Sequence, residues 1–370
     1  MSRLSRLSPG PGLRVDIVTA ERAPDELAQR WRELAVAAEN PFVLPEWHAA
    51  WVAAHTADAP LVLVCRERSG DIVGVVPLVL RDRRLLPAGE QLADWCGPAC
   101  APQDAARVAT AVIDALSRTS QRWDVWQLDR CRADDAWLDG LLRAADRSAI
   151  KLLPHRGDDV LVAVDLERNG PDLTTNKKQR ELERLDRRLR EAAHDVQLRR
   201  STTPAQIEHD LDALLRLRTA RWDVSFDAPE ESFLRALVGS LERLELLRLW
   251  AIDVDGEPAG VLLGWRLGSR AFAYSHAFDR AHERFGIGMA LLAHAVRAAA
   301  DEGCARYDML RGDEHFKGSF HISTAEVTCY RAVRRRSLAR LQAEAFVGAR
   351  SAYKRLRPQQ RERLRRALRI

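Results

Sequence analysis

A glycine-bearing turn, Phe285-Gly286-Ile287-Gly288, precedes a segment whose apolar residues recur at helical spacing. Glycines before a helix let the backbone approach a ligand closely, and the first amides of a helix, together with its dipole, favour an anion. We therefore expect Gly286, Ile287, Gly288 and Met289 to cradle a phosphate or pyrophosphate. A tight strand-to-helix turn that binds nothing has the same pattern, and the turn alone does not separate the two interpretations.

A cluster of ionisable residues follows that helix. Gly303 ends the helix, and Arg306 to Leu310 alternate as a short strand does. The residues after the strand include Arg311, Asp313, Glu314, His315 and Lys317. Loops at the carboxyl ends of strands are where α/β sheets usually build their sites.

These residue types suit acyl transfer from a thioester to an amine or hydroxyl. Asp313 and Glu314 are candidate bases, because a carboxylate can take the acceptor's proton directly or through water. Salt bridges to Arg311 or Lys317 are an equal alternative. His276, on the strand that leads to the turn, is a candidate to face the acyl group, although a lone histidine in a strand is more often structural.

Four residues are candidates for binding the substrate. Lys317 and Arg311 suit a phosphate or an acidic sugar, unless Lys317 pairs with Glu314 instead. Arg221 and Trp222 stand at the end of a predicted helix, and an aromatic face suits a sugar ring. Burial of Trp222 in the core is the alternative.

The elements that must position these residues occur twice in the chain. The run LVLVCRERSGDIVGV from Leu61 to Val75 aligns without a gap with LRLWAIDVDGEPAGV from Leu247 to Val261, and each reads as a hairpin. Trp123-Asp124-Val125 after one helix resembles Tyr307-Asp308-Met309 after another. Two matched segments in the same order predict a tandem α/β duplication.

The first half lacks both the glycine turn and the polar cluster. The second half is therefore expected to carry the chemistry, while the first supports it or holds part of the acceptor. A further strand is expected near Gln91 to Trp95 in the first half. The predicted boundaries are a flexible N-terminus at 1–12, a first domain at 13–165, a second at 166–335 and a basic helical tail at 336–370.

Length and composition agree with two domains in a reducing compartment. A chain of 370 residues exceeds the size at which single cores stop growing. No apolar run is long enough to span a membrane, and the start lacks the apolar core of a secretory signal. The six cysteines are dispersed, with no histidine placed to complete a metal site, so we expect a cytoplasmic protein without a metal.

The positive charge of the chain belongs to its tail. From Arg331 to Ile370 there are 14 Lys and Arg residues against 2 Asp and Glu residues, whereas the whole chain has a net charge of only +5. The tail is either a solvated helix or a contact with an anionic membrane surface. Nucleic acid is not favoured, because Tyr353 is the only aromatic residue among the clustered arginines of the segment that begins at Arg350.

The run DMLRGDEHFKGSF from Asp308 to Phe320, the preceding turn and helix, and the basic TTNKKQRELERLDRRLRE resemble the CelD-like acetyltransferases. That family has the GNAT fold, is often associated with bacterial polysaccharide production, and is distantly similar to the Fem peptidyltransferases, which have two GNAT-like domains. The resemblance implies a mixed, mostly antiparallel sheet flanked by helices. It also implies acetyl- or acyl-coenzyme A as donor, held where a central strand splays and the next helix begins, and a sugar or small metabolite as acceptor.

The chain departs from the family pattern at two positions. Glu283 occupies the first position of the phosphate motif Gln/Arg-x-x-Gly-x-Gly/Ala, and Phe316 stands where a tyrosine commonly precedes the lysine. His315, next to Phe316, is therefore the candidate that protonates a departing thiolate. Two alternatives to an acyl-coenzyme A transferase are a Fem-like peptidyltransferase that uses aminoacyl-tRNA and a non-catalytic binding protein of a polysaccharide machine.

Overall fold

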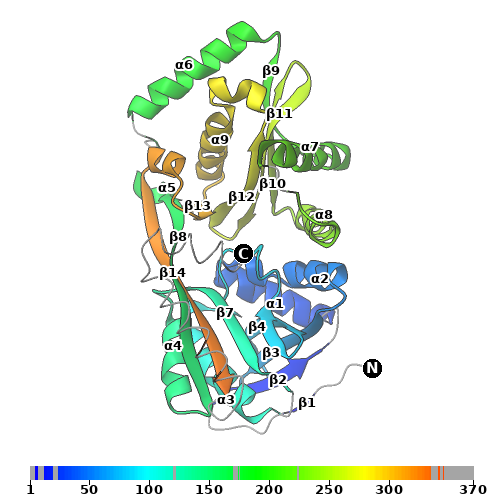
Figure 1. The fold of residues 1–370 in the computed structure, drawn as a ribbon, viewed down its shortest axis with the longest axis vertical. Coiled ribbons are helices and arrows are strands. Elements are labelled where there is room, and N and C mark those ends of the chain that lie inside the picture. Colours follow the sequence, from blue (N-terminus) through cyan, green and yellow to red (C-terminus); the bar gives the residue numbers. More distant parts are fainter. Residues whose placement is uncertain are drawn as a thin grey trace, which may run out of the picture.

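The computed structural model of the chain describes residues 5–6, 12–19, 24–119, 122–169, 174, 176–222, 225–334, 341 and 345. Two α/β units lie one above the other, and two long strands run between them (Figure 1). The basic tail expected at 336–370 lies outside the described residues, apart from Leu341 and Ala345, which are both helical.

The first unit begins with a strand and two helices, continues with four strands and a helix, and ends with a strand, a helix and a long strand. Its elements are β2 (Arg14–Val18), α1 (Asp25–Ala37), α2 (Pro45–Ala54), β3 (Ala59–Arg66), β4 (Ile72–Arg81), β5 (Arg84–Pro87), the short β6 (Ala99–Cys100), α3 (Ala105–Arg118), β7 (Val125–Arg132), α4 (Ala136–Asp146) and β8 (Ile150–Asp165). Proline at the first position of α2 fits, because that position needs no amide donor.

The second unit repeats this order after the linking helices α5 (Leu166–Asn169) and α6 (Asn176–Ala192). Its elements are β9 (Val196–Arg200), α7 (Pro204–Trp222), α8 (Ala228–Arg243), β10 (Leu247–Val254), β11 (Glu257–Leu267), β12 (Arg270–Phe278), the 3-10 turn η3 (Arg280–Phe285), α9 (Ile287–Asp301), β13 (Arg306–Arg311), the 3-10 turn η4 (His315–Ser319) and β14 (Ile322–Arg334). The tandem duplication predicted from the sequence is therefore present in the fold.

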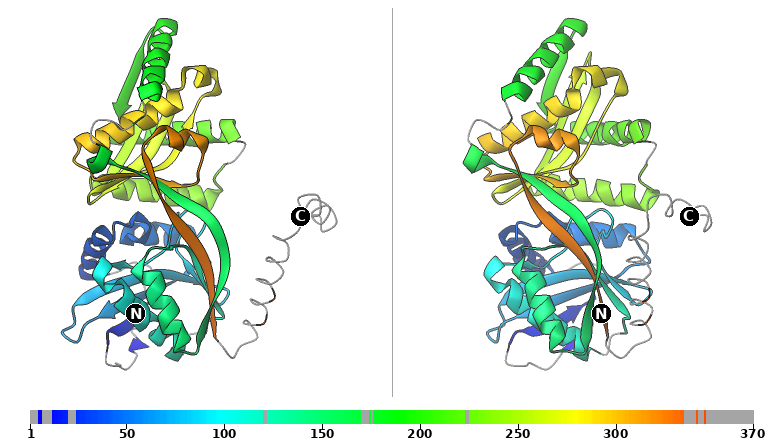
Figure 2. Two further views of the ribbon diagram at one scale, coloured as in Figure 1. Left: turned by 90° about the vertical axis from the view of Figure 1, so that its left-hand side faces the viewer. Right: turned by 60° about the vertical axis from the view of Figure 1, so that its left-hand side comes forward.

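The last strand of each unit is exchanged with the other unit. The described strands form one sheet in the order β1-β2-β3-β4-β5-β7-β14-β8-β13-β12-β11-β10-β9, where β1 is Ser5–Arg6. β14 pairs with β7 of the first unit, and β8 pairs with β13 of the second. β8 and β14 cross from one unit to the other as a twisted antiparallel pair (Figure 2).

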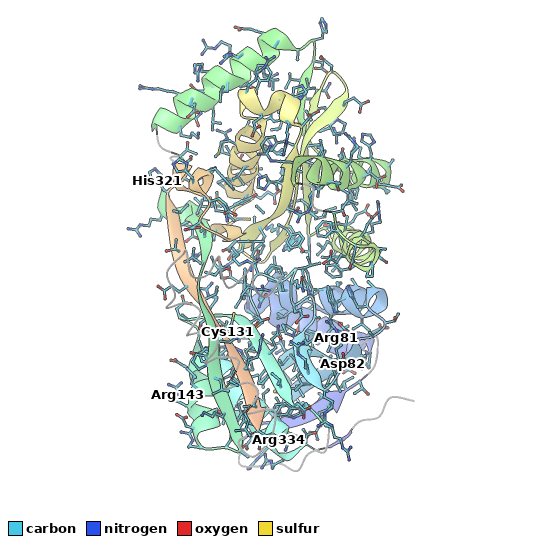
Figure 3. All side chains as sticks on the ribbon, in the orientation of Figure 1. Arg81, Asp82, Cys131, Arg143, His321 and Arg334 are labelled. Carbon is cyan, nitrogen blue, oxygen red and sulfur yellow. The ribbon has the colours of Figure 1, made fainter. Side chains whose placement is uncertain are left out.

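Side chains at the two ends of β14 show the extent of this crossing. His321, immediately before β14, lies beside the second unit, whereas Arg334, its last residue, lies at the far end of the first (Figure 3). The predicted boundary at Asp165 thus coincides with the end of β8, but the sheet continues across it. Two units joined by a strand exchange cannot separate without breaking long ladders of hydrogen bonds.

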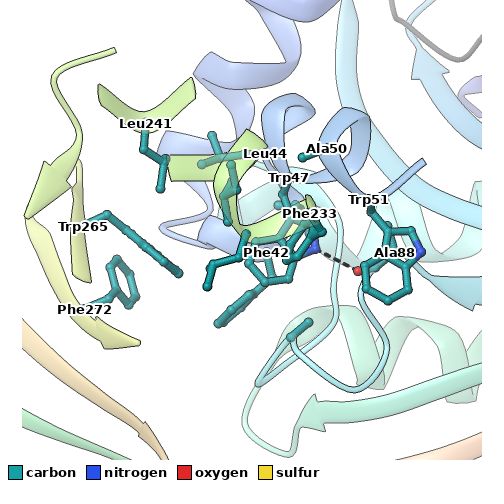
Figure 4. Packing of buried hydrophobic residues seen from close by; sticks show 14 of the residues in the cluster. Phe42, Leu44, Trp47, Ala50, Trp51, Ala88, Phe233, Leu241, Trp265 and Phe272 are labelled. Carbon is teal, nitrogen blue, oxygen red and sulfur yellow. Dashed lines mark hydrogen bonds between the residues drawn. The ribbon is translucent and has the colours of Figure 1, made fainter. Parts of the chain in front are cut away.

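A shared hydrophobic core also joins the units. Trp47 on α2 contacts Phe233 on α8 with ring centroids 4.9 Å apart, and its indole Nε1 donates to the carbonyl of Ala88 at 2.9 Å (Figure 4). Phe42 and Trp265 contribute to the same cluster from the two sides. Large aromatic side chains dominate the energetics of such interfaces, so the two units are held rigidly against each other.

The sequence predictions for the hairpins are confirmed, and two others are wrong. Gly70 and Gly256, at the turns of the matched hairpins, both have positive φ angles, of 103° and 85°. No strand forms at Gln91 to Trp95, which is a turn segment held on Gly89 by backbone hydrogen bonds. The structural counterpart of Tyr307 is Trp126, not Trp123. Trp126 is the second residue of β7 and pairs with Leu85 of β5, just as Tyr307 is the second residue of β13 and pairs with Ala271 of β12.

Because His48 on α2 is buried, we predict that acid destabilises the fold. Burial lowers its pKa to about 4 from 6.5, although the bond between Nε2 and the carbonyl of Leu78 offsets part of the effect. Because the unfolded chain binds the proton more tightly, stability is complete above pH 6.5 and is lost as the pH falls toward 4. His48→Gln should remove about 1.4 kcal/mol per pH unit of that loss, measured by urea unfolding across this range. An unchanged pH dependence in the variant would contradict this assignment.

No described helix is both long and apolar enough to cross a membrane.

Candidate active site

A cleft opens in the second unit where β12 and β13 part. The two strands are parallel and pair only at their beginnings, from Arg270 with Arg306 to Phe272 with Asp308. Beyond these residues the edge of β12 that faces β13 has no partner among the described strands. Tyr274 is an extra residue in the pairing of β12 with β11, a bulge that bends β12 at the point where the strands separate.

The cleft between the parted strands has a volume of about 860 Å³. Its walls come from β12, β13, the start of α9, the end of α7 and the polar loop after β13. It is lined by the predicted site residues His276, Gly286, Gly288, Met289, Arg221, Arg311, Glu314 and Lys317, and also by Asp94, Arg218, Ala273, Tyr274, Phe278, Glu283, Leu292, Met309, Leu310 and Phe316. The fold therefore brings the glycine turn and part of the polar loop to one cavity.

The glycine turn at the end of this cleft presents unbonded amides. Gly286 precedes α9 with φ 65° and ψ 28°, and its carbonyl accepts from the amides of Met289 and Ala290, each at 3.0 Å. The amides of Ile287 and Gly288 have no acceptor within the described part of the chain. Of the four predicted cradle residues, Ile287 and Gly288 thus have main-chain donors available for an anion at the N-terminus of α9.

Both glycines of the turn are required by their surroundings. A Cβ atom on Gly286 would lie 2.8 Å from Cδ1 of Leu185 on α6, and its φ angle is one that side chains rarely adopt. A Cβ atom on Gly288 would lie 2.4 Å from the ring of Phe278 on β12. The side chain of Ile287, by contrast, is fully buried in the core beneath the turn.

The polar loop is held in place by Lys317. Its buried ammonium group donates to the carbonyls of Arg311 at 2.8 Å and Gly312 at 3.0 Å, and it pairs with Oε2 of Glu314 at 2.8 Å. An ammonium group has three donors, and all three are used within the loop. The substrate-binding role predicted for Lys317 does not fit this arrangement, because no donor remains for a phosphate or a sugar.

Glu314 and His276 lie in the cleft with pKa values that suit a base poorly. Partial burial opposes ionisation of Glu314, but the hydrogen bond from Lys317 and the nearby positive charge outweigh it, so its pKa lies below the usual value. Burial lowers the pKa of His276 to about 4, so the ring is neutral near pH 7. An efficient base has a pKa near the working pH.

Asp313 and His315 do not line this cleft. They lie around an adjoining hollow of about 310 Å³, which includes Ile322 and Thr324 at the start of β14 and shares Glu314 and Lys317 with the cleft. Their predicted catalytic roles therefore need a substrate that reaches both hollows. The structure describes Trp222 only as the last residue of α7, and its side chain lies outside the described atoms.

Arg221 compensates for the unusual residue of the phosphate motif. Its Nη2 atom lies 3.2 Å from Oε1 of Glu283, and its guanidinium group stacks on the ring of Phe278 at 3.9 Å. The negative charge of Glu283 beside the turn is thus paired. An incoming phosphate would compete with Glu283 for Arg221.

Asp94 is a residue of this site that sequence reasoning missed. It comes from the first unit, from the segment between β5 and β6, and reaches into the cleft of the second. Its Oδ1 atom lies 3.4 Å from Nε of Arg311, which also pairs with Asp159 at 3.5 Å. No local motif marks Asp94, because only the packing of one unit on the other brings it here.

The first unit has the same splay, but the space between its parted strands is largely filled. β5 and β7 pair in parallel only from Arg84 with Val125 to Leu85 with Trp126. Trp95, Trp126 and Trp137 fill the space beyond, leaving about 20 Å³. A hollow of about 350 Å³ near the start of α3, lined by Trp95, Ala105 and Arg132 among others, remains in the first unit and is smaller than the cleft of the second. Within the described residues no group of His, Cys, Asp or Glu side chains is placed to hold a metal ion.

In this site the parallel strands β12 and β13 part and lead to free amides at the start of α9. The resemblance to GNAT-fold acetyltransferases implies this arrangement for an acyltransferase. Comparison with protein families agrees with this class: residues 176–318 match the model of the acetyltransferase (GNAT) domain. Most of the second unit therefore matches a GNAT-type acetyltransferase domain, and the α/β fold predicted from the sequence is confirmed. A search of curated proteins gives no match.

Solved structures resemble the chain over nearly its whole length. FemX matches with a TM-score of 0.62 at 11% identity, covering 84% of this chain and 98% of FemX. L-PGS from Bacillus licheniformis matches with a TM-score of 0.53 at 10% identity, covering 89% and 97%. The C-terminal domain of a putative lysylphosphatidylglycerol synthetase from Agrobacterium fabrum matches with a TM-score of 0.52 at 12% identity, covering 86% and 95%. At these identities the likeness is one of fold.

Proposed function

We propose that the protein transfers an acyl group, acetyl being the simplest, from acyl-coenzyme A to an amine or hydroxyl of a sugar or small metabolite. The observation that supports this proposal most is the pair of unbonded amides at Ile287 and Gly288 at the end of the cleft. A pyrophosphate on these amides would direct the thioester arm along the unpaired edge of β12. The narrower link to polysaccharide synthesis rests only on the CelD-like resemblance of LRGDE and the residues around it.

Donor binding is the first test of this function. Acetyl-coenzyme A should raise the melting temperature of the protein in proportion to the logarithm of its concentration above the dissociation constant. Acetyl-pantetheine, which lacks the nucleotide and its phosphates, should give a much smaller shift at the same concentration. Equal shifts from both compounds would remove the glycine turn from the donor site.

The positive charge on α6 suggests an alternative donor, which the same titration can test. Arg180, Arg184, Arg187 and Arg188 are exposed on one face of this helix, and Leu185 of the same helix contacts the glycine turn. Such a face suits a polyanionic donor such as aminoacyl-tRNA, and FemX shares the fold. A thermal shift with charged tRNA but none with acetyl-coenzyme A would favour this alternative, and no shift with either would favour a non-catalytic binding protein.

Glu283→Gln should strengthen donor binding. The side chain of Glu283 is 57% exposed and lies beside the turn, where its charge repels a phosphate and occupies Arg221. Removing a like charge about 4 Å from a phosphate is worth about 1 kcal/mol in water, which lowers the dissociation constant roughly fivefold. Calorimetric titration at low salt measures it, with Glu208→Gln as the matched control, because Glu208 is exposed near the start of α7, whereas the end of α7 lines the cleft. A weaker affinity in Glu283→Gln would show that the carboxylate itself contributes to the site.

A further inference from the structure

Asp94 lies in the cleft, beside the end of β13. The strands β12 and β13 meet at Phe272 and Asp308, so residues just beyond this pair form the narrow end of the cleft. The Oδ2 atom of Asp94 accepts from the amide of Arg311 at 3.5 Å, and Oδ1 lies 3.4 Å from Nε of the same residue. Its charge also acts on Tyr274, the bulged residue where the strands separate. The turn for the phosphates lies at the opposite end of β12.

The segment that carries Asp94 is held firmly in this position. Trp47 donates to the carbonyl of Ala88, the amides of Leu92 and Ala93 both donate to the carbonyl of Gly89, and the amide of Cys96 donates to the carbonyl of Arg130. A guanidinium nitrogen of Arg130 also bonds to the carbonyl of Glu90. The first unit thus places one carboxylate in a site that belongs otherwise to the second.

We propose that Asp94 is the general base of the reaction and that the acceptor is a primary amine, which arrives as an ammonium ion. This inference rests on the proposed acyltransferase function. The amine gives its proton to the Asp94 carboxylate, and its lone pair forms the C–N bond to the thioester carbon. The C–S bond then breaks and the thiolate leaves with the electron pair. The second proton of the attacking nitrogen passes through solvent to the thiolate, which leaves an amide and a free thiol.

The surroundings of Asp94 suit this role better than those of the other carboxylate in the cleft. Burial raises the pKa of Asp94 above its usual value, and the charges of Arg311, Arg130 and Lys317 offset only part of that rise. The phenol of Tyr274 is another titratable group that the charge of Asp94 affects. Burial raises the pKa of this phenol and keeps it neutral. Glu314 is paired with Lys317 instead. Two carboxyl groups whose environments move their pKa values apart are a usual sign of separate roles.

The assignment also explains why the first unit is joined so closely to the second. Its own splay is narrowed by Trp95, Trp126 and Trp137, and the donor is assigned to the larger cleft of the second unit. Its contribution to the reaction is then a single side chain whose position depends on the shared core and on the exchanged strands β8 and β14.

The test compares two nucleophiles in the full chain. Release of the thiol from acetyl-coenzyme A is measured with hydroxylamine, which is largely neutral at neutral pH, and with ethanolamine, which is protonated. Asp94→Asn should lower the ethanolamine rate by roughly 10²- to 10⁴-fold, the usual contribution of a general base. It should lower the hydroxylamine rate by less than about tenfold, because that amine needs no deprotonation before attack. The thermal shift with acetyl-coenzyme A should stay unchanged.

Asp159→Asn is the matched control. It removes the other carboxylate that pairs with Arg311 but lies outside the cleft, so both amine rates should remain near those of the wild type. Equal loss of both rates in Asp94→Asn would assign Asp94 a structural role, and loss of neither would remove it from the reaction. Either outcome would overturn the role of Asp94 as the base but would leave the proposed acyltransferase function standing. Wild-type protein that binds no acetyl-coenzyme A, or binds it and reacts with neither amine, would overturn the acyltransferase function instead.

Discussion

Gly286→Val is expected to abolish binding of acetyl-coenzyme A. The valine side chain would enter the space of Leu185, 2.8 Å from the position of Cβ, and its branched carbon does not tolerate a φ angle of 65°. The turn must then move, and with it the amides of Ile287 and Gly288. Each charge-assisted hydrogen bond to a phosphate is worth about 1.5–3 kcal/mol, so losing both should weaken binding by roughly 10²- to 10⁴-fold.

Gly303→Val separates this effect from general strain. Gly303 lies just beyond the other end of α9, has a φ angle of 74°, and has no described atom within 4 Å of the position that a Cβ atom would take. Both substitutions should lower the free energy of unfolding by about 1–3 kcal/mol, because both force a side chain into a left-handed conformation. Only Gly286→Val should lose the titration with acetyl-coenzyme A. If the two variants bind the donor equally well, the turn is not part of the site.

Lys317→Met is expected to destabilise the polar loop more than any other single change there. It removes the ammonium group that donates to the carbonyls of Arg311 and Gly312 and that pairs with Glu314. Each buried carbonyl left without a donor costs about 1–3 kcal/mol. Urea unfolding should therefore show a loss of several kcal/mol, and donor turnover should fall because the loop forms one wall of the cleft.

Lys178→Met is the control for loss of a lysine charge. Lys178 pairs with Glu181 at 3.1 Å on α6, and both side chains are partly exposed. Exposed pairs of this kind contribute about 0–1 kcal/mol, so the variant should remain near the stability of the wild type. Equal effects in the two variants would show that Lys317 does not hold the loop.

Local patterns in the sequence are sufficient to predict the repeated elements and the turn. The hairpins around Gly70 and Gly256 can be predicted because each turn needs a residue that tolerates positive φ, and glycine supplies it. The start of α9 can be predicted because Gly286 breaks one periodic segment and another begins at Ile287. These features depend on neighbours in the chain, which the sequence shows directly.

Features that depend on partners distant in the sequence could not be predicted. Nothing in the sequences of β8 and β14 specifies that each pairs with a strand of the other unit. The segment around Asp94 contains Trp95 and Leu92, which favour a strand although the backbone turns there. Its place in the cleft follows from the packing of two units, for which one sequence has no local signal.

Calorimetric titration of the wild-type chain with acetyl-coenzyme A tests the central claim most directly, since the two units share a fold but the donor is assigned to the cleft of only one of them. The structure predicts saturable binding with one site per chain, lost in Gly286→Val and kept in Gly303→Val. Absence of binding, or two equivalent sites per chain, would contradict the assignment of the donor to the cleft between β12 and β13.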